Sequence, residues 1–163
     1  MKKTFSILIL CLTLLLAGCG VSSQDVMDSI PTLTLESGSN STTLPSFGYE
    51  WTVTNQWGNS NIIIADTVHP LESQETLTTV SLSSGAEVTL TFSKIPDSVT
   101  VTYWSADETD LENSTQVETS FLDNSFHFTV PEITGQIVVL ISGSWTSYDN
   151  VSGTVSYAFR TVA

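Results

Sequence analysis

The chain has 163 residues and a formal net charge of −13, with 17 acidic residues against four Lys and Arg. This acidity excludes a protein that binds nucleic acid or anionic lipid through a basic face, because both need cations to neutralise phosphate. Hydrophobic residues make up 40% of the chain, enough for one packed domain rather than a disordered acidic tail. Two cysteines and two histidines leave little material for a zinc site or a disulfide framework.

The first residues have the features of a signal peptide. A positive start, Lys2-Lys3, is followed by an apolar run over residues 5–17 that is too short to span a bilayer. The run ends in Leu-Ala-Gly-Cys, Leu16 to Cys19. This order resembles the lipobox of bacterial lipoproteins. The resemblance implies cleavage before Cys19, acylation of Cys19, and a lipid-anchored protein on the extracytoplasmic face of the cell membrane.

The rest of the chain is predicted to contain one domain. We expect a signal peptide at residues 1–18, a lipidated tether at 19–31 and a β-domain at 32–163. The tether is predicted because its residues are polar, partly acidic and without clear periodicity. Cleavage would leave Cys19 as the only cysteine. Because that cysteine would carry lipid, no disulfide is expected in the domain.

Alternation of apolar residues with Thr and Ser dominates the chain from Thr32 onward and is typical of half-buried strands. Strands are predicted around residues 33–35, 49–53, 62–64, 80–82, 88–92, 99–103, 126–130, 136–141 and 155–159. Two of them are continuous apolar runs, Ile62-Ile63-Ile64 and residues 136–141. We interpret the first as a strand covered on both faces and the second as a central strand.

Short strands at regular spacing, separated by turn residues, favour an all-β fold. Turns are predicted at Ser83-Ser84-Gly85 and at Ile95-Pro96-Asp97-Ser98, and no segment of the β-domain has a helical apolar stripe. We therefore predict an antiparallel β-sandwich, immunoglobulin-like in form. A small closed β-barrel is the alternative, because the strand pattern does not separate the two.

Several short elements follow one another along residues 31–163. They are Phe47-Gly48-Tyr49-Glu50-Trp51, Ala65-Asp66, Pro70-Leu71, Ser84-Gly85, Val130-Pro131, Gly135, Trp145, Gly153 and Tyr157-Ala158-Phe159. Their layout resembles a group of secreted or lipid-anchored domains of Gram-positive bacteria with no assigned activity. The resemblance implies a sandwich fold and an extracytoplasmic location, and it brings no catalytic residue.

Only His69 and His127 are candidate bases for nucleophilic catalysis. Asp66 and His69 share a loop and could form an orienting pair beside a serine. However, Gly143-Ser144-Trp145 lacks the second glycine of a Gly-x-Ser-x-Gly elbow. We favour turn roles for Asp66 and His69, and we expect His127 on an exposed sheet face. No catalytic residue is assigned, and we expect the protein not to be an enzyme.

Residues 105–124 hold the densest charge and are predicted to be the longest segment between strands. Asp107, Glu108, Asp110 and Glu112 are candidate ligand-binding residues, because grouped oxygens can accept hydrogen bonds from sugars or attract a basic partner. They could also hold Ca²⁺, although the glycine and the terminal glutamate of an EF-hand are missing. The favoured interpretation is a solvated acidic loop, and no metal or cofactor is expected.

The four tryptophans differ in their predicted environments. Trp51 is in phase with the inner residues of its strand and is expected in the core, whereas Trp57 lies in a turn and is expected to be exposed. Trp104 is out of phase with its strand and precedes the acidic loop, so we place it in the candidate site as a stacking surface. The alternative is that Trp104 and Trp145 close the ends of the sandwich.

Together these features predict a lipid-anchored extracytoplasmic binding or structural module. The protein would be attached to the membrane through the lipid on Cys19, and no nucleic-acid partner is expected. An accessory lipoprotein that binds a protein is the leading hypothesis. A carbohydrate-binding module is the alternative, followed by a small hydrolase.

Overall fold

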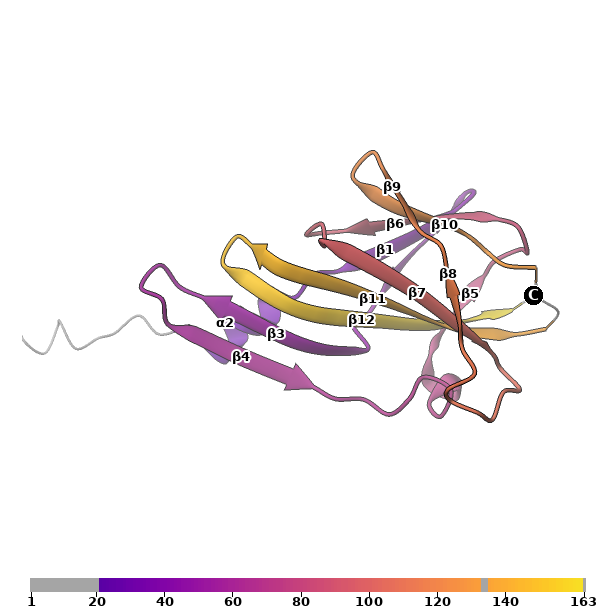
Figure 1. Cartoon of the computed structure of the whole chain (residues 1–163), viewed down its shortest axis with the longest axis horizontal. Helices are drawn as coiled ribbons and strands as arrows, with labels where there is room; N and C mark the ends of the chain where they lie inside the picture. The colour runs from indigo at the N-terminus through magenta and orange to yellow at the C-terminus, as the bar shows by residue number, and fades with distance from the viewer. Residues whose placement is uncertain (1–20, 133–134, 163) are drawn as a thin grey trace, which may run out of the picture.

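The structure is a computed structural model that describes residues 21–132 and 135–162. The predicted signal peptide, residues 1–18, and the predicted lipidation site, Cys19, lie outside these ranges. Two sheets of antiparallel strands pack against each other and do not close on themselves (Figure 1). The prediction of an antiparallel β-sandwich is therefore confirmed, and the barrel alternative is wrong.

The two sheets differ in size. In spatial order, the smaller sheet contains β2 (Asn40–Leu44), β1 (Leu33–Ser37), β6 (Glu87–Phe92), β10 (Ser125–Thr129) and β9 (Ser120–Leu122). The larger contains β4 (Ser60–Ala65), β3 (Gly48–Thr54), β12 (Val151–Val162), β11 (Ile137–Tyr148), β7 (Ser98–Ser105) and β8 (Thr115–Val117). A seventh strand, β5 (Thr78–Ser81), pairs in parallel with the end of β12.

Aromatic side chains join the two sheets in the core. Trp51 of β3 and Trp145 of β11 meet edge to face with ring centroids 5.2 Å apart. Phe92 of β6 reaches across from the smaller sheet to Trp145 (6.0 Å) and to Tyr157 of β12 (5.9 Å). Tyr157 is fully buried and donates a 2.6 Å hydrogen bond to the carbonyl of Pro31, and burial raises its pKa. The predicted core position of Trp51, which is 0% exposed, is confirmed.

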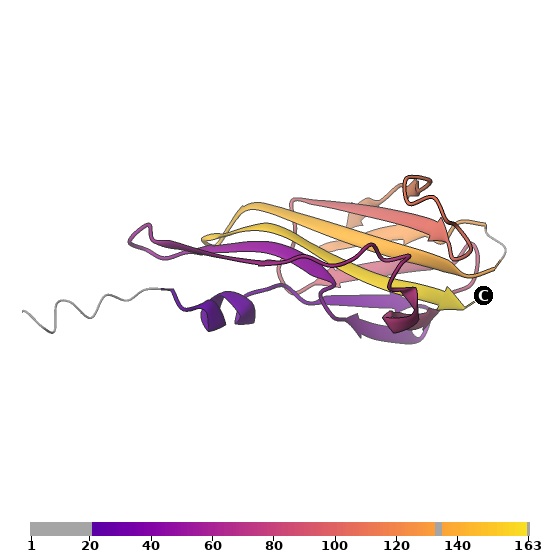
Figure 2. The ribbon, with the colours of Figure 1, turned by 90° about the horizontal axis from the view of Figure 1, so that it is seen from below.

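The described part of the predicted tether is folded onto the sandwich. Residues Ser23–Asp28 form α2, a short helix that begins with a capping box between Ser22 and Asp25. Val26 on this helix is 0% exposed and belongs to the core, and Trp51 donates a 2.9 Å hydrogen bond from Nε1 to Ser29 Oγ. Packing of Val21, Val26 and Ile30 against the core and hydrogen bonds from Trp51, Asn61 and Lys94 thus hold this segment. Figure 2 shows the course of the segment along the domain.

Some strands differ from the predictions. β11 is a central strand with Val138 and Val139 both buried, as predicted. By contrast, β4 is an edge strand with Ile62 55% and Ile64 61% exposed, so the prediction of a strand covered on both faces is wrong. Segments 40–44, 115–117 and 120–122 were not predicted as strands, and the last two divide the segment expected to be one long loop.

Candidate functional site

Trp104 lies on the outer face of the larger sheet, beneath two loops. It is 5% exposed and packs with Leu71 and Val138 in a small second core. The ring of His69 meets it edge-on at 4.8 Å, and its Nε1 donates a 2.9 Å hydrogen bond to the carbonyl of Leu111. With 5% of its surface exposed, Trp104 does not offer the stacking surface that we expected of it. Trp104 is buried, as the end-closing alternative requires, but it lies on the outer face of the larger sheet and not in the core between the two sheets.

The acidic loop satisfies its own backbone. Glu108 accepts hydrogen bonds from the backbone N–H groups of Thr109 (2.9 Å) and Asp110 (3.0 Å), and a third from the Asn113 side-chain amide. These hydrogen bonds, with that from Asp110 the strongest, lower the pKa of Glu108. Asp110 in turn accepts from the backbone N–H of Glu112 at 3.0 Å. The carboxylates thus hold the loop in shape.

The four carboxylates of the candidate site do not converge on one point. Asp107, Asp110 and Glu112 are exposed, and Glu108 is half-buried. Within residues 21–132 and 135–162, no three His, Cys, Asp or Glu side chains are grouped so that they could hold a metal ion. The structure therefore gives the possible Ca²⁺ site no support. Binding of a basic partner or of sugar hydroxyls by these carboxylates stays a prediction.

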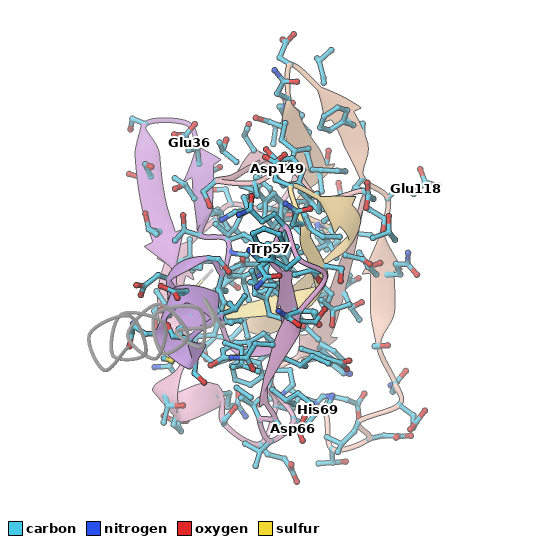
Figure 3. All side chains as sticks on the ribbon, turned by 90° about the vertical axis from the view of Figure 1, so that its left-hand side faces the viewer. Glu36, Trp57, Asp66, His69, Glu118 and Asp149 are labelled. Carbon is cyan, nitrogen blue, oxygen red and sulfur yellow. The ribbon has the colours of Figure 1, made fainter. Side chains whose placement is uncertain are left out.

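His69 and Asp66 lie near each other at one margin of the molecule (Figure 3). His69 Nδ1 accepts a 3.3 Å hydrogen bond from the backbone N–H of Leu71, while the ring packs against Trp104. The imidazole is thus engaged in holding residues 66–77 over the second core. This use matches the turn role that we favoured for it.

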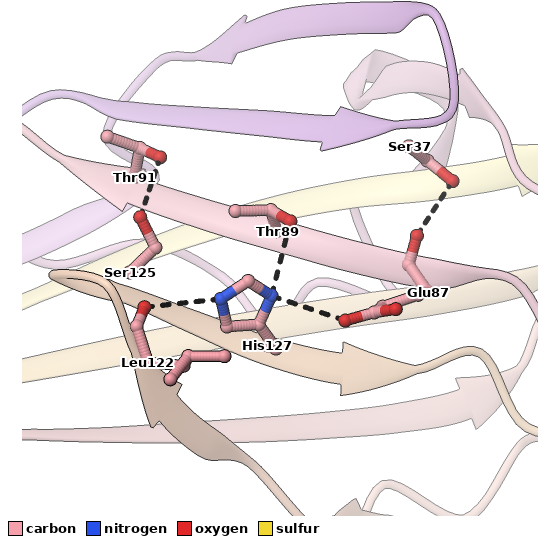
Figure 4. A network of polar contacts seen from close by, with 7 residues as sticks. All are labelled: Ser37, Glu87, Thr89, Thr91, Leu122, Ser125 and His127. Carbon is pink, nitrogen blue, oxygen red and sulfur yellow. Dashed lines mark hydrogen bonds and ion pairs between the residues drawn. The ribbon is translucent and has the colours of Figure 1, made fainter.

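His127 points away from the main core, as its alternation predicts, but its side chain is only 18% exposed. Its Nε2 lies 3.3 Å from the carbonyl oxygen of Leu122, and its Nδ1 lies 3.2 Å from the hydroxyl of Thr89 (Figure 4). A carbonyl only accepts, so Nε2 carries the proton and Nδ1 accepts from Thr89 in the neutral ring. The carboxylate of Glu87 lies 3.5 Å from Nδ1.

A groove of about 410 Å³ runs beside His127, between β10 and the segment that joins β8 to β9. Glu87, Glu118 and Ser120 line it together with the imidazole. Nε2 is the atom that would activate a nucleophile if Nδ1 were held by Glu87, but it faces a backbone carbonyl instead. The groove therefore offers hydrogen-bonding groups without an activated hydroxyl.

Exposed apolar side chains, which sequence reasoning largely missed, gather on two hairpins. The β9–β10 hairpin exposes Phe121 (53%) and Leu122 (62%). The β3–β4 hairpin exposes Ile62, Ile64 and Trp57, and the predicted exposure of Trp57 is confirmed at 73%. Figure 3 shows Trp57 at the end of the molecule that faces the viewer.

The comparisons with known proteins add no relative. No protein-family model matches the chain, no curated protein is similar to it, and no solved structure matches it. Across residues 21–132 and 135–162, none of the helices has both the length and the apolar character needed to cross a bilayer.

Proposed function

We propose that this chain is a lipid-anchored extracytoplasmic module that binds a protein partner. The observation that carries the anchoring is the order of Lys2-Lys3, an apolar run, and Leu16 to Cys19 with cysteine last. Acylation of Cys19 would hold the protein firmly, because several acyl chains bind a bilayer far more tightly than one.

Binding of a partner is supported by the β9–β10 hairpin. β9 is the edge strand of the smaller sheet and pairs on one side with β10. The exposed ring of Phe121 rests on Phe126 with centroids 4.8 Å apart, so it is presented from a fixed position. A fixed exposed aromatic is typical of the residues that dominate protein interfaces, and an unpaired strand edge can accept an added strand.

Charge around this hairpin suggests the chemistry of the partner. Glu118 precedes β9 and is exposed, and Asp123 occupies the turn to β10 with a φ of 50°. The two carboxylates lie on either side of β9 in the sequence. Because successive residues of a strand point to opposite faces, the surface that they border is that of Phe121, with Leu122 on the other face. A partner with an apolar pocket rimmed by Lys or Arg would match this surface, and its binding would weaken as salt screens the rim charges.

Anchoring is tested by expressing the full chain and its Cys19→Ser variant in a bacterial host. The wild-type protein should fractionate with membranes, and mass spectrometry should find an N-terminal peptide that begins with acylated Cys19. The variant should lack the acyl chains. An unmodified N-terminal residue other than Cys19 in the wild-type protein would refute the anchoring.

Partner binding is tested with a photo-crosslinking amino acid at Phe121 in the same host. Position Thr43 is a matched control, because it is exposed on β2 at the other edge of the same sheet. Position 121 should give a discrete protein adduct that fades as ionic strength rises, while position 43 should give none. Equal labelling from both positions would contradict a binding surface on β9.

A further inference from the structure

The β3–β4 hairpin carries a fixed, exposed tryptophan at its tip. Asn55 Oδ1 accepts hydrogen bonds from the backbone N–H groups of Trp57 (2.9 Å) and Asn59 (3.0 Å), and Gly58 takes a φ of 80°. These interactions fix the backbone of the turn. The indole of Trp57 nevertheless remains 73% exposed. The tip therefore presents a large aromatic side chain from an ordered backbone.

The same hairpin is apolar and uncharged along one strand. Ile62 and Ile64 are exposed on β4 and continue from the tip along the edge of the larger sheet. No charged residue occurs between Glu50 and Asp66. In a protein with 17 acidic residues, this hairpin can approach a negatively charged surface with little electrostatic repulsion of its own.

The N-terminal segment runs toward this tip. Ser29 lies beside Trp51 near the middle of β3, where Trp51 Nε1 bonds its hydroxyl. Eight residues earlier, the carbonyl of Val21 accepts a 3.2 Å hydrogen bond from Asn61, which pairs with Val53 near the turn. From Ser29 back to Val21 the chain thus approaches the hairpin tip (Figure 2).

Very little chain separates this point from the proposed anchor. Cys19 precedes Val21 by two residues, which can span at most about 7 Å. The interfacial layer on each side of a bilayer is about 5–8 Å thick. An acylated Cys19 must therefore hold Asn61, and the turn beyond it, close to the headgroups.

We propose that the β3–β4 hairpin inserts Trp57 into the headgroup layer of the membrane to which Cys19 is anchored. The inference rests on the proposed acylation and adds the orientation that it imposes. Tryptophan favours the membrane interface, because its ring is apolar and its N–H finds hydrogen-bond partners there. The short tether keeps the local lipid concentration high, so the weak contact of one indole is enough.

This orientation puts the β3–β4 hairpin and the acidic loop at different distances from the membrane. The β3–β4 turn and the start of α2 lie at one end of the sandwich, and the segments that follow β4 and β7 lie at the other (Figure 1). With Trp57 at the headgroups, the acidic loop is held away from the membrane by the length of the sandwich. Its exposed carboxylates are thereby kept from anionic lipid.

The test uses residues 19–163, which contain every buried core residue of the described chain, from Val26 to Thr161. Cys19 is the only thiol in this fragment and can be coupled to a maleimide lipid in phosphatidylcholine vesicles, so docking is measured whether or not cells acylate it. Trp51, Trp104 and Trp145 are at most 5% exposed. Comparison of the wild type with Trp57→Phe therefore isolates the fluorescence of Trp57.

Coupling to vesicles should lower acrylamide quenching of Trp57 several-fold relative to the uncoupled protein, and lipids brominated on the acyl chains should quench it. A Gly-Ser linker inserted between Gly20 and Val21 should restore acrylamide quenching, because a longer tether lowers the effective concentration of lipid around the hairpin. Phe121→Ser, which removes an exposed aromatic from a different sheet, should change neither measurement.

Equal acrylamide quenching of Trp57 on vesicles and in solution would overturn the inference, as would shielding that the linker leaves unchanged. Neither result depends on processing in the cell. Loss of the proposed function is detected separately, by an N-terminal peptide without acylated Cys19. Without acylation the hairpin would not be held at a membrane in the cell, so that result would also overturn the inference.

Discussion

The two ends of the sandwich use tryptophan and charge in opposite ways. At one end, residues 66–77 and the acidic loop cover Trp104, which is 5% exposed. At the other end, the uncharged β3–β4 hairpin leaves Trp57 73% exposed. The aromatic residue beside the acidic loop is buried, whereas the one on the uncharged hairpin is exposed to its surroundings.

This contrast shows that the densest charge in the molecule has a structural use within its own loop. Glu108 and Asp110 accept hydrogen bonds from their own loop, so the acidic cluster is largely a means of fixing the backbone. An exposed apolar side chain has no such internal use. Trp57 and Ile62 stay 73% and 55% exposed in the folded domain, which leaves most of their apolar area for a surface outside the domain to bury.

Replacing the two tryptophans separates a packing role from a surface role. Trp104→Ala should lower the free energy of unfolding by about 3–5 kcal/mol, because it empties the second core and removes the hydrogen bond to Leu111. Trp57→Ala should change it by no more than about 0.5 kcal/mol. Urea unfolding followed by circular dichroism measures both. Similar losses from the two variants would abolish the distinction between the ends.

A close backbone contact is expected to hold the hairpin end together. A Cβ at Gly153 of β12 would lie 2.0 Å from the carbonyl oxygen of Glu50 on β3, and the φ of Gly153 is 141°. Gly153→Ala should therefore cost on the order of 3 kcal/mol. Gly58→Ala, in the turn between β3 and β4, is the control, because its Cβ would meet nothing within 4 Å. Only the left-handed backbone is penalised there, by about 1 kcal/mol, so thermal unfolding should rank the two variants clearly.

The N-terminal segment should behave as part of the hairpin end. Val26→Ala removes a fully buried side chain of α2 and should cost about 2 kcal/mol. Met27→Ala alters the neighbouring residue, which is 50% exposed, and should cost less than about 0.5 kcal/mol. Chemical denaturation provides the comparison. If Val26→Ala is as neutral as Met27→Ala, the segment is a flexible tether in solution, as the sequence first indicated.

The sequence predicts the sandwich because alternation reports directly on which side of a strand faces the core. Val88, Leu90 and Phe92 alternate with polar residues and are all buried on β6. Turn chemistry likewise places Trp57 correctly in an exposed loop. Both patterns are local, so distant parts of the chain do not alter their meaning.

Outer faces of the sheets are less predictable, because their burial depends on remote segments. The run at Ile62 to Ile64 looks covered on both faces, but the chain that follows β4 turns away and covers Trp104 instead. Val26 escapes prediction for a related reason. A few apolar residues in a polar stretch give no clear periodicity, and only the packing of this segment against the sandwich, beside Trp51, makes Val26 part of the core.

The smallest expected effect is a pH dependence of the melting temperature that arises from the acidic loop and not from the β3–β4 hairpin. Hydrogen bonds lower the pKa of Glu108 from 4.5, so ionised Glu108 stabilises the folded loop above that value. This stabilisation is lost as the pH falls through the lowered pKa of the folded state. The wild-type protein should therefore exceed Glu108→Gln in melting temperature at neutral pH, and the difference should vanish in acid.

Two controls identify the origin of that difference. Asp107→Asn removes an exposed carboxylate of the same loop that makes none of these hydrogen bonds, so its melting temperature should follow the wild type more closely. The β3–β4 hairpin has no titratable side chain between Glu50 and Asp66, so acrylamide shielding of Trp57 on phosphatidylcholine vesicles should not follow the protonation of Glu108. A Glu108→Gln difference that persists below the pKa of the folded carboxyl would show that the amide disturbs Asn113 by its shape rather than by its charge. Shielding of Trp57 that changes in step with that difference would show that the two ends are coupled through the sheet.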